Sequence, residues 1–211
     1  MNEAHPLARA LLEASVITVT SRNVVVLGAG SGRNIAPLLS AGWYVDVLEE
    51  APERAREVAA RFGAEARLRV VLGSYGEPIA GASAYDAGLS THALLHGSRA
   101  RVAAALRATA GALRPHAPFF FTLGSTADPR FRTGQRIDVD TWAAEGGSEA
   151  GVPHVYFDEQ GVRSLLGDFE LLSLEEREGA ASAGRWAHTE AEAASIVHWF
   201  VRVRKRPAEP Q

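Results

Sequence analysis

The 211-residue chain contains no cysteine, so it forms no disulfide bond, no thiolate metal site and no cysteine nucleophile. It has no apolar run of the ~18 residues that a membrane span needs, and its N-terminus lacks the basic-then-apolar pattern of a secretory signal. Basic residues are not in excess, since 22 Lys and Arg stand against 25 Asp and Glu. We therefore expect a cytoplasmic protein whose partners are neither membranes nor nucleic acids.

The length and composition favour a single globular domain over residues 1–211. At about 150 residues per domain, the chain makes one large domain or one domain with an elaboration. Its hydrophobic content of 46% and charged content of 22% are ordinary for a globular protein. The sequence leaves the oligomeric state open.

Strand patterns alternate with helical patterns along most of the chain. Short β-branched and aromatic runs predict strands at 24–27, 43–48, 67–72, 84–89, 119–123, 169–174 and 195–204. Apolar spacing with glycine and proline signals predicts helices at 5–15, 33–41, 51–62, 98–113 and 158–166. This alternation predicts an α/β fold, a Rossmann-like, doubly wound, mostly parallel seven-stranded sheet with a C-terminal antiparallel strand.

Three parts of the chain lie outside this alternation. Residues 1–22 are expected to form a helical lead-in, and residues 205–211 a disordered tail. Residues 125–157 follow the fifth predicted strand. We expect this insertion to cover the substrate site.

A glycine-rich loop, Gly28-Ala29-Gly30-Ser31-Gly32, lies directly between the first predicted strand and the next helix. Glycines there allow a sharp turn and let a ligand approach the backbone. In open α/β sheets, nucleotide-like ligands bind at this position. The dinucleotide fingerprint G-x-G-x-x-G would need glycine at position 33, which is Arg33, and the Gly-Lys-Ser/Thr ending of a phosphate loop is absent.

An acidic residue, Glu49, ends the second predicted strand about 20 residues beyond the loop. A carboxylate there can accept hydrogen bonds from both hydroxyls of a ribose, which favours an adenosyl ligand without choosing between cofactors. Glu50 follows it, and its side chain is expected to point elsewhere if the strand continues. The alternative interpretation is a glycine turn beside solvated acids.

Several blocks of the sequence resemble class I S-adenosylmethionine (SAM)-dependent methyltransferases over roughly residues 20–204. VVVLGAGSGRN resembles their first motif, YVDVLEEAPERA the second-strand block, and VVLGSY the third-strand block. YDAGLSTHALLH resembles the fourth-strand motif, and LRPHAPFFFTLGS the helix-to-strand turn that follows. GVPHVYFDEQGVRSLL is similar to small-molecule and tellurite-resistance-type methyltransferases.

This resemblance implies SAM as cofactor and a small molecule as methyl acceptor. The residues that we assign to the cofactor are Gly28, Ala29, Gly30, Ser31, Gly32, Asn34, Glu49, Glu50, Ser74, Tyr75, Ser90 and Thr91. The chain departs from the family at two of the relevant positions. Val26 stands where the family usually has an acid, and Ser74 replaces an adenine-side Asp, so both departures point to weaker cofactor binding.

Candidate catalytic residues follow from their positions beside the expected cleft. His92 comes just after the fourth predicted strand, and His154 and Tyr156 lie in the 125–157 insertion. Each histidine has an alternative as a structural or solvated imidazole. His92 and His96 have the spacing of metal ligands on a helix, but HExxH and cysteine are absent, so we expect no metal.

Methyl transfer from a sulfonium is an in-line displacement that needs alignment and exclusion of water, with a base only when the acceptor must lose a proton. The leading hypothesis is therefore a SAM-dependent methyltransferase. A non-catalytic SAM- or nucleotide-binding module is a second hypothesis, motivated by Val26 and Ser74. An NAD-dependent oxidoreductase is the third, and Arg33 in place of the third glycine counts against it.

Overall fold

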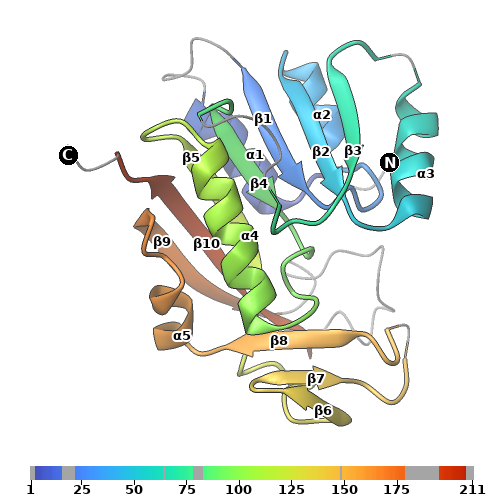
Figure 1. The fold of residues 1–211 in the computed structure, drawn as a ribbon, viewed down its shortest axis with the longest axis vertical. Helices are drawn as coiled ribbons and strands as arrows, with labels where there is room; N and C mark the ends of the chain where they lie inside the picture. Colours follow the sequence, from blue (N-terminus) through green and yellow to red (C-terminus); the bar gives the residue numbers. More distant parts are fainter. Residues whose placement is uncertain are drawn as a thin grey trace.

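The structure is a computed structural model that describes residues 3–15, 22–63, 65–77, 83–147, 149–178 and 195–207. Its helices are α1 (Pro6–Ser15), α2 (Ile35–Ser40), α3 (Pro52–Phe62), α4 (Arg99–Ala112) and α5 (Glu159–Ser164). Its strands are β1 (Asn23–Leu27), β2 (Tyr44–Glu49), β3 (Leu68–Leu72), β4 (Ala87–Ser90), β5 (Pro118–Ser125), β6 (Gln135–Asp138), β7 (Thr141–Ala143), β8 (Pro153–Phe157), β9 (Phe169–Glu178) and β10 (Val197–Lys205). Figure 1 shows how these elements are arranged.

The predicted seven-stranded sheet is present. Strands β3, β2, β1, β4 and β5 pair in this order and are parallel throughout. β10 then pairs antiparallel with β5, and β9 pairs antiparallel with β10. The strand order reverses direction between β1 and β4, which is where ligands bind in open α/β sheets.

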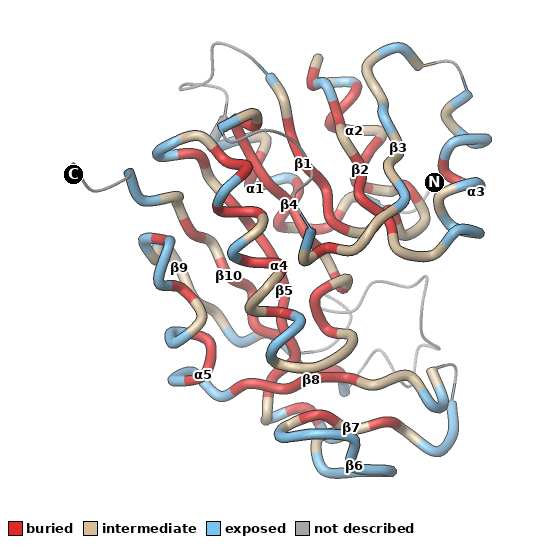
Figure 2. Tube along the Cα trace, viewed as in Figure 1, coloured by how far each residue is buried: buried red, intermediate tan, exposed pale blue. Residues whose placement is uncertain are grey.

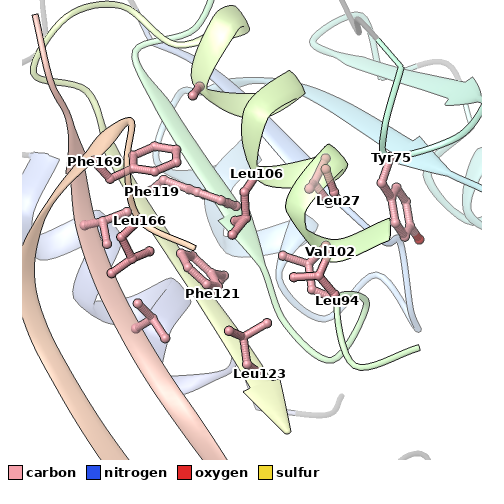
Figure 3. Close-up of a cluster of buried hydrophobic side chains, with 14 of the residues drawn as sticks. Leu27, Tyr75, Leu94, Val102, Leu106, Phe119, Phe121, Leu123, Leu166 and Phe169 are labelled. Atoms are coloured by element: carbon pink, nitrogen blue, oxygen red, sulfur yellow. The ribbon is translucent and has the colours of Figure 1, made fainter. Parts of the chain in front are cut away.

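Helices cover both faces of this sheet, as the doubly wound prediction requires. On one face, Leu106 of α4 packs with Phe119, Phe121 and Leu123 of β5 (Figure 3), and Val162 of α5 belongs to the same buried cluster. On the other face, α1, α2 and α3 pack with the alternate side chains of β1, β2 and β4. Because both faces are covered, the central strands are almost entirely buried (Figure 2), which explains their continuous apolar runs.

The insertion after β5 forms three further strands. β5 runs past the end of β4, and its last residues, Gly124 and Ser125, pair in parallel with β8. Because β10 pairs with β5 as far as Gly124, β8 lies along the opposite edge of β5, the edge that β4 occupies earlier. β7 and β6 extend β8 in antiparallel order (Figure 1), so residues 125–157 form an extension of the sheet beyond the carboxyl end of β4.

The two ends of the chain match their predictions in part. The lead-in contains α1, and residues 16–21 lie outside the described residues. The prediction of a disordered tail from residue 205 is wrong at its start, because Lys205 pairs with Phe169 as the last residue of β10. Residues 208–211 lie outside the described residues. No helix in the described ranges combines the length and the apolar character needed to cross a membrane.

Candidate functional site

The glycine-rich loop leaves β1 and turns into α2 with three left-handed residues. Gly28, Gly30 and Gly32 have φ angles of 82°, 51° and 76°, a region that residues with a Cβ rarely adopt. A Cβ on Gly28 would lie only 2.6 Å from the Cβ of Ala93. A Cβ on Gly30 would meet nothing within 4 Å. The loop is therefore tightly packed at Gly28 and open at Gly30.

The carboxylate of Glu49 lies against this loop. Its Oε2 accepts a hydrogen bond from the Ala29 N–H at 2.8 Å, and its Oε1 accepts from the N–H groups of Glu50 and Ala51, each at 3.0 Å. Glu49 is only 4% exposed, so these three donors compensate for lost hydration and fix its orientation. A carboxylate oxygen can accept two hydrogen bonds, which leaves Oε2 able to accept one more.

Glu50 faces away from the glycine loop, in the direction expected from strand geometry. Its Oε1 accepts a hydrogen bond from the Tyr75 N–H at 3.0 Å, and its Oε2 pairs with the guanidinium of Arg101. Its neighbour in this arrangement, Ser74, accepts a hydrogen bond from the Gly76 N–H at 3.3 Å. Glu50 and Ser74 therefore hold the loop after β3 in place, and neither lines the cleft described below.

Two polar residues connect the glycine loop to the end of β4. Asn34 donates from Nδ2 to the Thr91 hydroxyl oxygen at 2.8 Å, while its Oδ1 accepts from the His5 N–H at 2.9 Å. Ser90 is fully buried and donates to the Leu27 carbonyl oxygen at 3.3 Å. Asn34 and Ser90 position the loops around the cleft, whereas Thr91 lines it.

A cleft of about 420 Å³ opens between the glycine loop, the end of β2 and the loop after β4. This volume lies within the range of small-molecule sites. Of the residues assigned from the sequence, it is lined by Gly28, Gly30, Ser31, Glu49, Tyr75, Thr91 and His92. Sequence reasoning missed Arg54, Glu57, Ala93 and Glu149 and set His96 aside as a ligand. Arg54 and Glu57 lie on α3, directly after Glu49, and that proximity was a usable signal.

Tyr75 closes one side of this cleft with a side chain that is 7% exposed. Burial, followed by the charges of Glu49 and Glu50, raises the pKa of the Tyr75 hydroxyl above its usual range. The hydroxyl therefore stays protonated at neutral pH and is able to donate a hydrogen bond to a ligand.

His92 and His96 do not share a helical face, because residues 91–98 form no helix. His92 has a φ of 64°, its N–H donates to the Thr122 hydroxyl oxygen at 2.8 Å, and its ring contacts those of His5 and His198 edge to face. The His96 ring instead contacts that of His154, with the ring centres 4.7 Å apart. Both His92 and His96 therefore line the cleft, but their rings contact different residues.

The two candidate catalytic residues from the insertion do not line the cleft themselves. His154 is 6% exposed, and its Nε2 lies 3.1 Å from the Oε2 of Glu149, which does line the cleft. Tyr156 is 3% exposed, packs against the ring of Phe131, and has a pKa raised to about 12, chiefly by burial. Tyr156 therefore packs as part of β8 and does not reach the cleft.

No protein-family model and no curated protein sequence matches the chain. Solved structures do match it. A SAM-dependent methyltransferase from Methanosarcina mazei superimposes with a TM-score of 0.74 at 13% identity, covering 97% of this chain and 99% of its own. The 1,6-didemethyltoxoflavin-N1-methyltransferase of Burkholderia thailandensis gives 0.64 at 19% identity, covering 96% and 80%. The N-methyltransferase NodS of Bradyrhizobium japonicum gives 0.65 at 14%, covering 95% and 94%.

These likenesses span nearly the whole chain at low sequence identity. They show that the chain has the α/β fold of these methyltransferases, with a mostly parallel central sheet and antiparallel pairing near the C-terminus.

Proposed function

We propose that the protein transfers a methyl group from SAM to a small-molecule acceptor. The observation that carries this proposal is the hydrogen bond between Glu49 and the open glycine loop. It lies at the point where the strand order reverses, in a fold like that of known methyltransferases. The relative from Burkholderia thailandensis was solved with S-adenosylhomocysteine (SAH) and a small aromatic heterocycle bound. A cleft of about 420 Å³ suits ligands of this size.

The residues of the cleft fit the groups of SAM. Gly30 leaves room beside the backbone where a Cβ would project, and Glu49 retains acceptor capacity for a ribose hydroxyl. The hydroxyl of Ser31 is buried and has no hydrogen-bond partner among the described residues, although Ser31 lines the cleft. A ligand with polar groups satisfies such an atom, and an unsatisfied one carries a cost in free energy.

When bound, SAM supplies a methyl group activated by a positively charged sulfur. The tasks of this chain's residues are to hold the adenosyl part, to orient the acceptor in line with the methyl carbon and to exclude water. Glu49, Tyr75 and the glycine loop serve the first task. His92, at the cleft wall after β4, is our candidate for contact with the acceptor, and the 125–157 segment is our candidate for its cover.

Calorimetric titration with SAH tests the cofactor proposal. Glu49→Gln should weaken binding about 10- to 100-fold, because a hydrogen bond to a charged acceptor contributes about 1.5–3 kcal/mol. The Gln carbonyl oxygen still accepts from the N–H groups of Glu50 and Ala51, and of the three backbone hydrogen bonds only that from the Ala29 N–H is lost. Glu53→Gln, at an exposed carboxylate on α3, is the matched control and should bind normally. Equal affinities in the two variants would refute the role of Glu49.

A binding module without turnover is the second candidate. Val26 is 2% exposed and packs in the core, and the Ser74 hydroxyl is engaged by Gly76, so neither supplies a cofactor contact of the usual acidic kind. Release of SAH from SAM in the presence of a panel of small acceptors separates the two candidates. Binding without any release favours the module. Thermal stabilisation by NADH but not by SAM would instead favour an oxidoreductase.

A further inference from the structure

Three potential metal ligands converge beside the cleft, outside the groups assigned to the cofactor. One ligand atom each from His96, Glu149 and His154 lies within 4.8 Å of the other two. His96 follows β4, Glu149 belongs to the link between β7 and β8, and His154 lies in β8. Because these three residues come from different segments of the chain, the backbone must hold the segments close together if the side chains are to share a ligand.

The backbone around this cluster is fixed by hydrogen bonds between the two histidine segments. His96 and His154 form an antiparallel bridge. On either side of it, the Gly97 N–H donates to the Pro153 carbonyl at 2.9 Å, and the Val155 N–H donates to the Leu95 carbonyl at 2.9 Å. The two imidazoles are therefore held on paired backbone segments, and a preformed position costs less ordering when a ligand binds.

The ring of His154 is oriented as metal-binding histidines usually are. Its Nδ1 lies 2.9 Å from the Val152 carbonyl oxygen, and because a carbonyl can only accept, the hydrogen must be on Nδ1. The lone pair of a neutral ring is then on Nε2, which faces the Glu149 Oε2 at 3.1 Å. Two acceptors that face each other need a proton or a cation between them.

His96 offers a second imidazole. Its Nδ1 is buried and has no hydrogen-bond partner among the described residues. A ring with such a nitrogen, beside two other potential ligands, can bind an ion without first giving up a hydrogen bond at that nitrogen.

We propose that His96, Glu149 and His154 bind a divalent transition-metal ion, of which Zn²⁺ is the best fit. Two imidazole nitrogens and one carboxylate oxygen are typical ligands of Zn²⁺ and its neighbours, whereas Mg²⁺ and Ca²⁺ prefer oxygen alone. Three protein ligands leave a coordination position open, as in catalytic zinc sites. The site revises the expectation of no metal, which considered His92 as the partner of His96.

The charges near the cluster permit a cation. Arg130 lies 3.7 Å from Glu149, but it forms two hydrogen bonds of 2.9 Å with the carboxylate of Asp128. Arg101 forms an ion pair with Glu50. Both guanidinium groups therefore have a carboxylate partner besides Glu149.

The open position faces the cleft, because His96 and Glu149 line the same cavity as Glu49 and Gly30. Its use in catalysis rests on the proposed function and selects acceptors with an ionisable O–H or S–H group. The acceptor loses its proton to solvent as its oxygen or sulfur binds the ion. The heteroatom's electron pair then forms a bond to the methyl carbon of SAM, and the carbon–sulfur bond breaks with its pair going to sulfur, which gives SAH.

The test is a titration of the chelator-treated full chain with Zn²⁺ in competition with a chromophoric chelator. We expect one Zn²⁺ per chain and a loss of at least about tenfold in affinity for His96→Ala, Glu149→Gln and His154→Ala. His116→Asn, at an exposed histidine with a φ of 66°, is the matched control and should bind Zn²⁺ like the unchanged chain. Binding of less than one ion per chain, or unchanged affinity in all three variants, overturns the proposal.

Two further readouts keep the test independent of folding and of the proposed function. Co²⁺ bound to the unchanged chain should give the visible absorption spectrum of a four-coordinate site, and this spectrum should change in Glu149→Gln. A six-coordinate spectrum that is the same in the unchanged chain and in Glu149→Gln contradicts the ligand set. SAH is titrated into the same samples. Zn²⁺ binding without SAH binding supports the metal site and refutes the proposed function. SAH binding without Zn²⁺ binding refutes the metal site and supports the proposed cofactor.

Discussion

His92 and His96 are four residues apart, yet their rings contact different partners. The spacing implies a shared face only in a helix, and the left-handed residue His92 turns the chain instead. His92 consequently faces the N-terminal segment and β10, whereas His96 pairs with β8. The left-handed φ of His92 thus separates the partners of the two rings, and the neighbouring residues in the sequence do not predict this angle.

Gly28 and Gly30 should respond differently to the same substitution. Gly28→Ala forces a Cβ to within 2.6 Å of Ala93 in addition to the left-handed strain, so we expect a loss of about 2–4 kcal/mol in unfolding free energy. Gly30→Ala pays only the strain, about 1–2 kcal/mol, but its Cβ enters the cleft. Thermal melts and SAH titrations check this. Stable Gly28→Ala, or Gly30→Ala with unimpaired SAH binding, would contradict it.

The residues of the site that were predictable from the sequence lie at the carboxyl ends of predicted strands, as Tyr75, Thr91 and His92 do, or within the first strand–loop–helix–strand unit. Glu49 comes about 20 residues after Gly28, and the length of that unit fixes where its side chain arrives. Glu149 and His96 meet through a pairing between segments more than 50 residues apart. No local periodicity encodes that contact, and the four-residue spacing of His92 and His96 does not indicate it.

At the scale of elements, the predictable strands are those that the sheet buries on both faces. β1 and β5 contain apolar runs, VVVL and FFF, because helices cover the sheet on both sides, and β4 is likewise buried at all four residues. β6 is exposed at every residue, and β7 has only three residues, so neither shows a strand pattern. β8 is buried at four of its five residues, but its PHVYF sequence follows directly on β6 and β7, whose residues show no strand pattern, and so it was not separated from the insertion.

Asp128, in the turn after β5, connects this turn to the start of β10. Its carboxylate is almost fully buried and accepts four hydrogen bonds: two from the Arg130 guanidinium, one from the Arg130 N–H and one from the Val197 N–H, each at 2.9 Å. Burial alone raises the pKa of Asp128, but the hydrogen bonds and charge of Arg130 outweigh it, so the pKa lies below its usual range. Its contribution to stability is therefore present above the unfolded pKa of about 3.9 and is lost as the pH falls.

Asp128→Asn should lower the unfolding free energy by about 1–3 kcal/mol at neutral pH, because it removes the charge of a buried carboxylate that accepts hydrogen bonds from the partly exposed Arg130. Denaturant titrations at a series of pH values should also show a flatter loss of stability between about pH 5 and pH 2 than in the unchanged chain. The matched control is Glu170→Gln, which breaks an exposed pair with Arg204 and should cost less than about 1 kcal/mol. Parallel pH curves for Asp128→Asn and the unchanged chain would refute the assignment.

At the scale of the whole molecule, the cleft is assembled from segments that are far apart in the sequence. The loop after β1, the start of α3, the loop after β4 and the link before β8 each contribute lining residues. Only the completed sheet brings these four segments together. Ligand binding and global folding are therefore thermodynamically coupled, and a ligand for the native state stabilises the entire chain.

Hydrogen exchange with and without SAH should report this coupling in a defined pattern. The N–H groups of Ala29, Glu50 and Ala51 all donate to Glu49, so immobilising that carboxylate should slow their exchange. The exposed edge strand β6 should exchange quickly in both states. If SAH instead protects only the turn between α4 and β5, which lies at the amino ends of the parallel strands, SAH binds at another site.

The strand order also has a consequence for biosynthesis. β9 pairs only with β10 among the described strands, and β10 follows it in the chain. A nascent polypeptide therefore exposes β9 and the aromatic edge of β5 until Lys205 has left the ribosome. The sheet closes only after β10 has been synthesised. A message truncated before β10 would produce a chain with an open strand edge, which is prone to aggregate and is a natural substrate for chaperones.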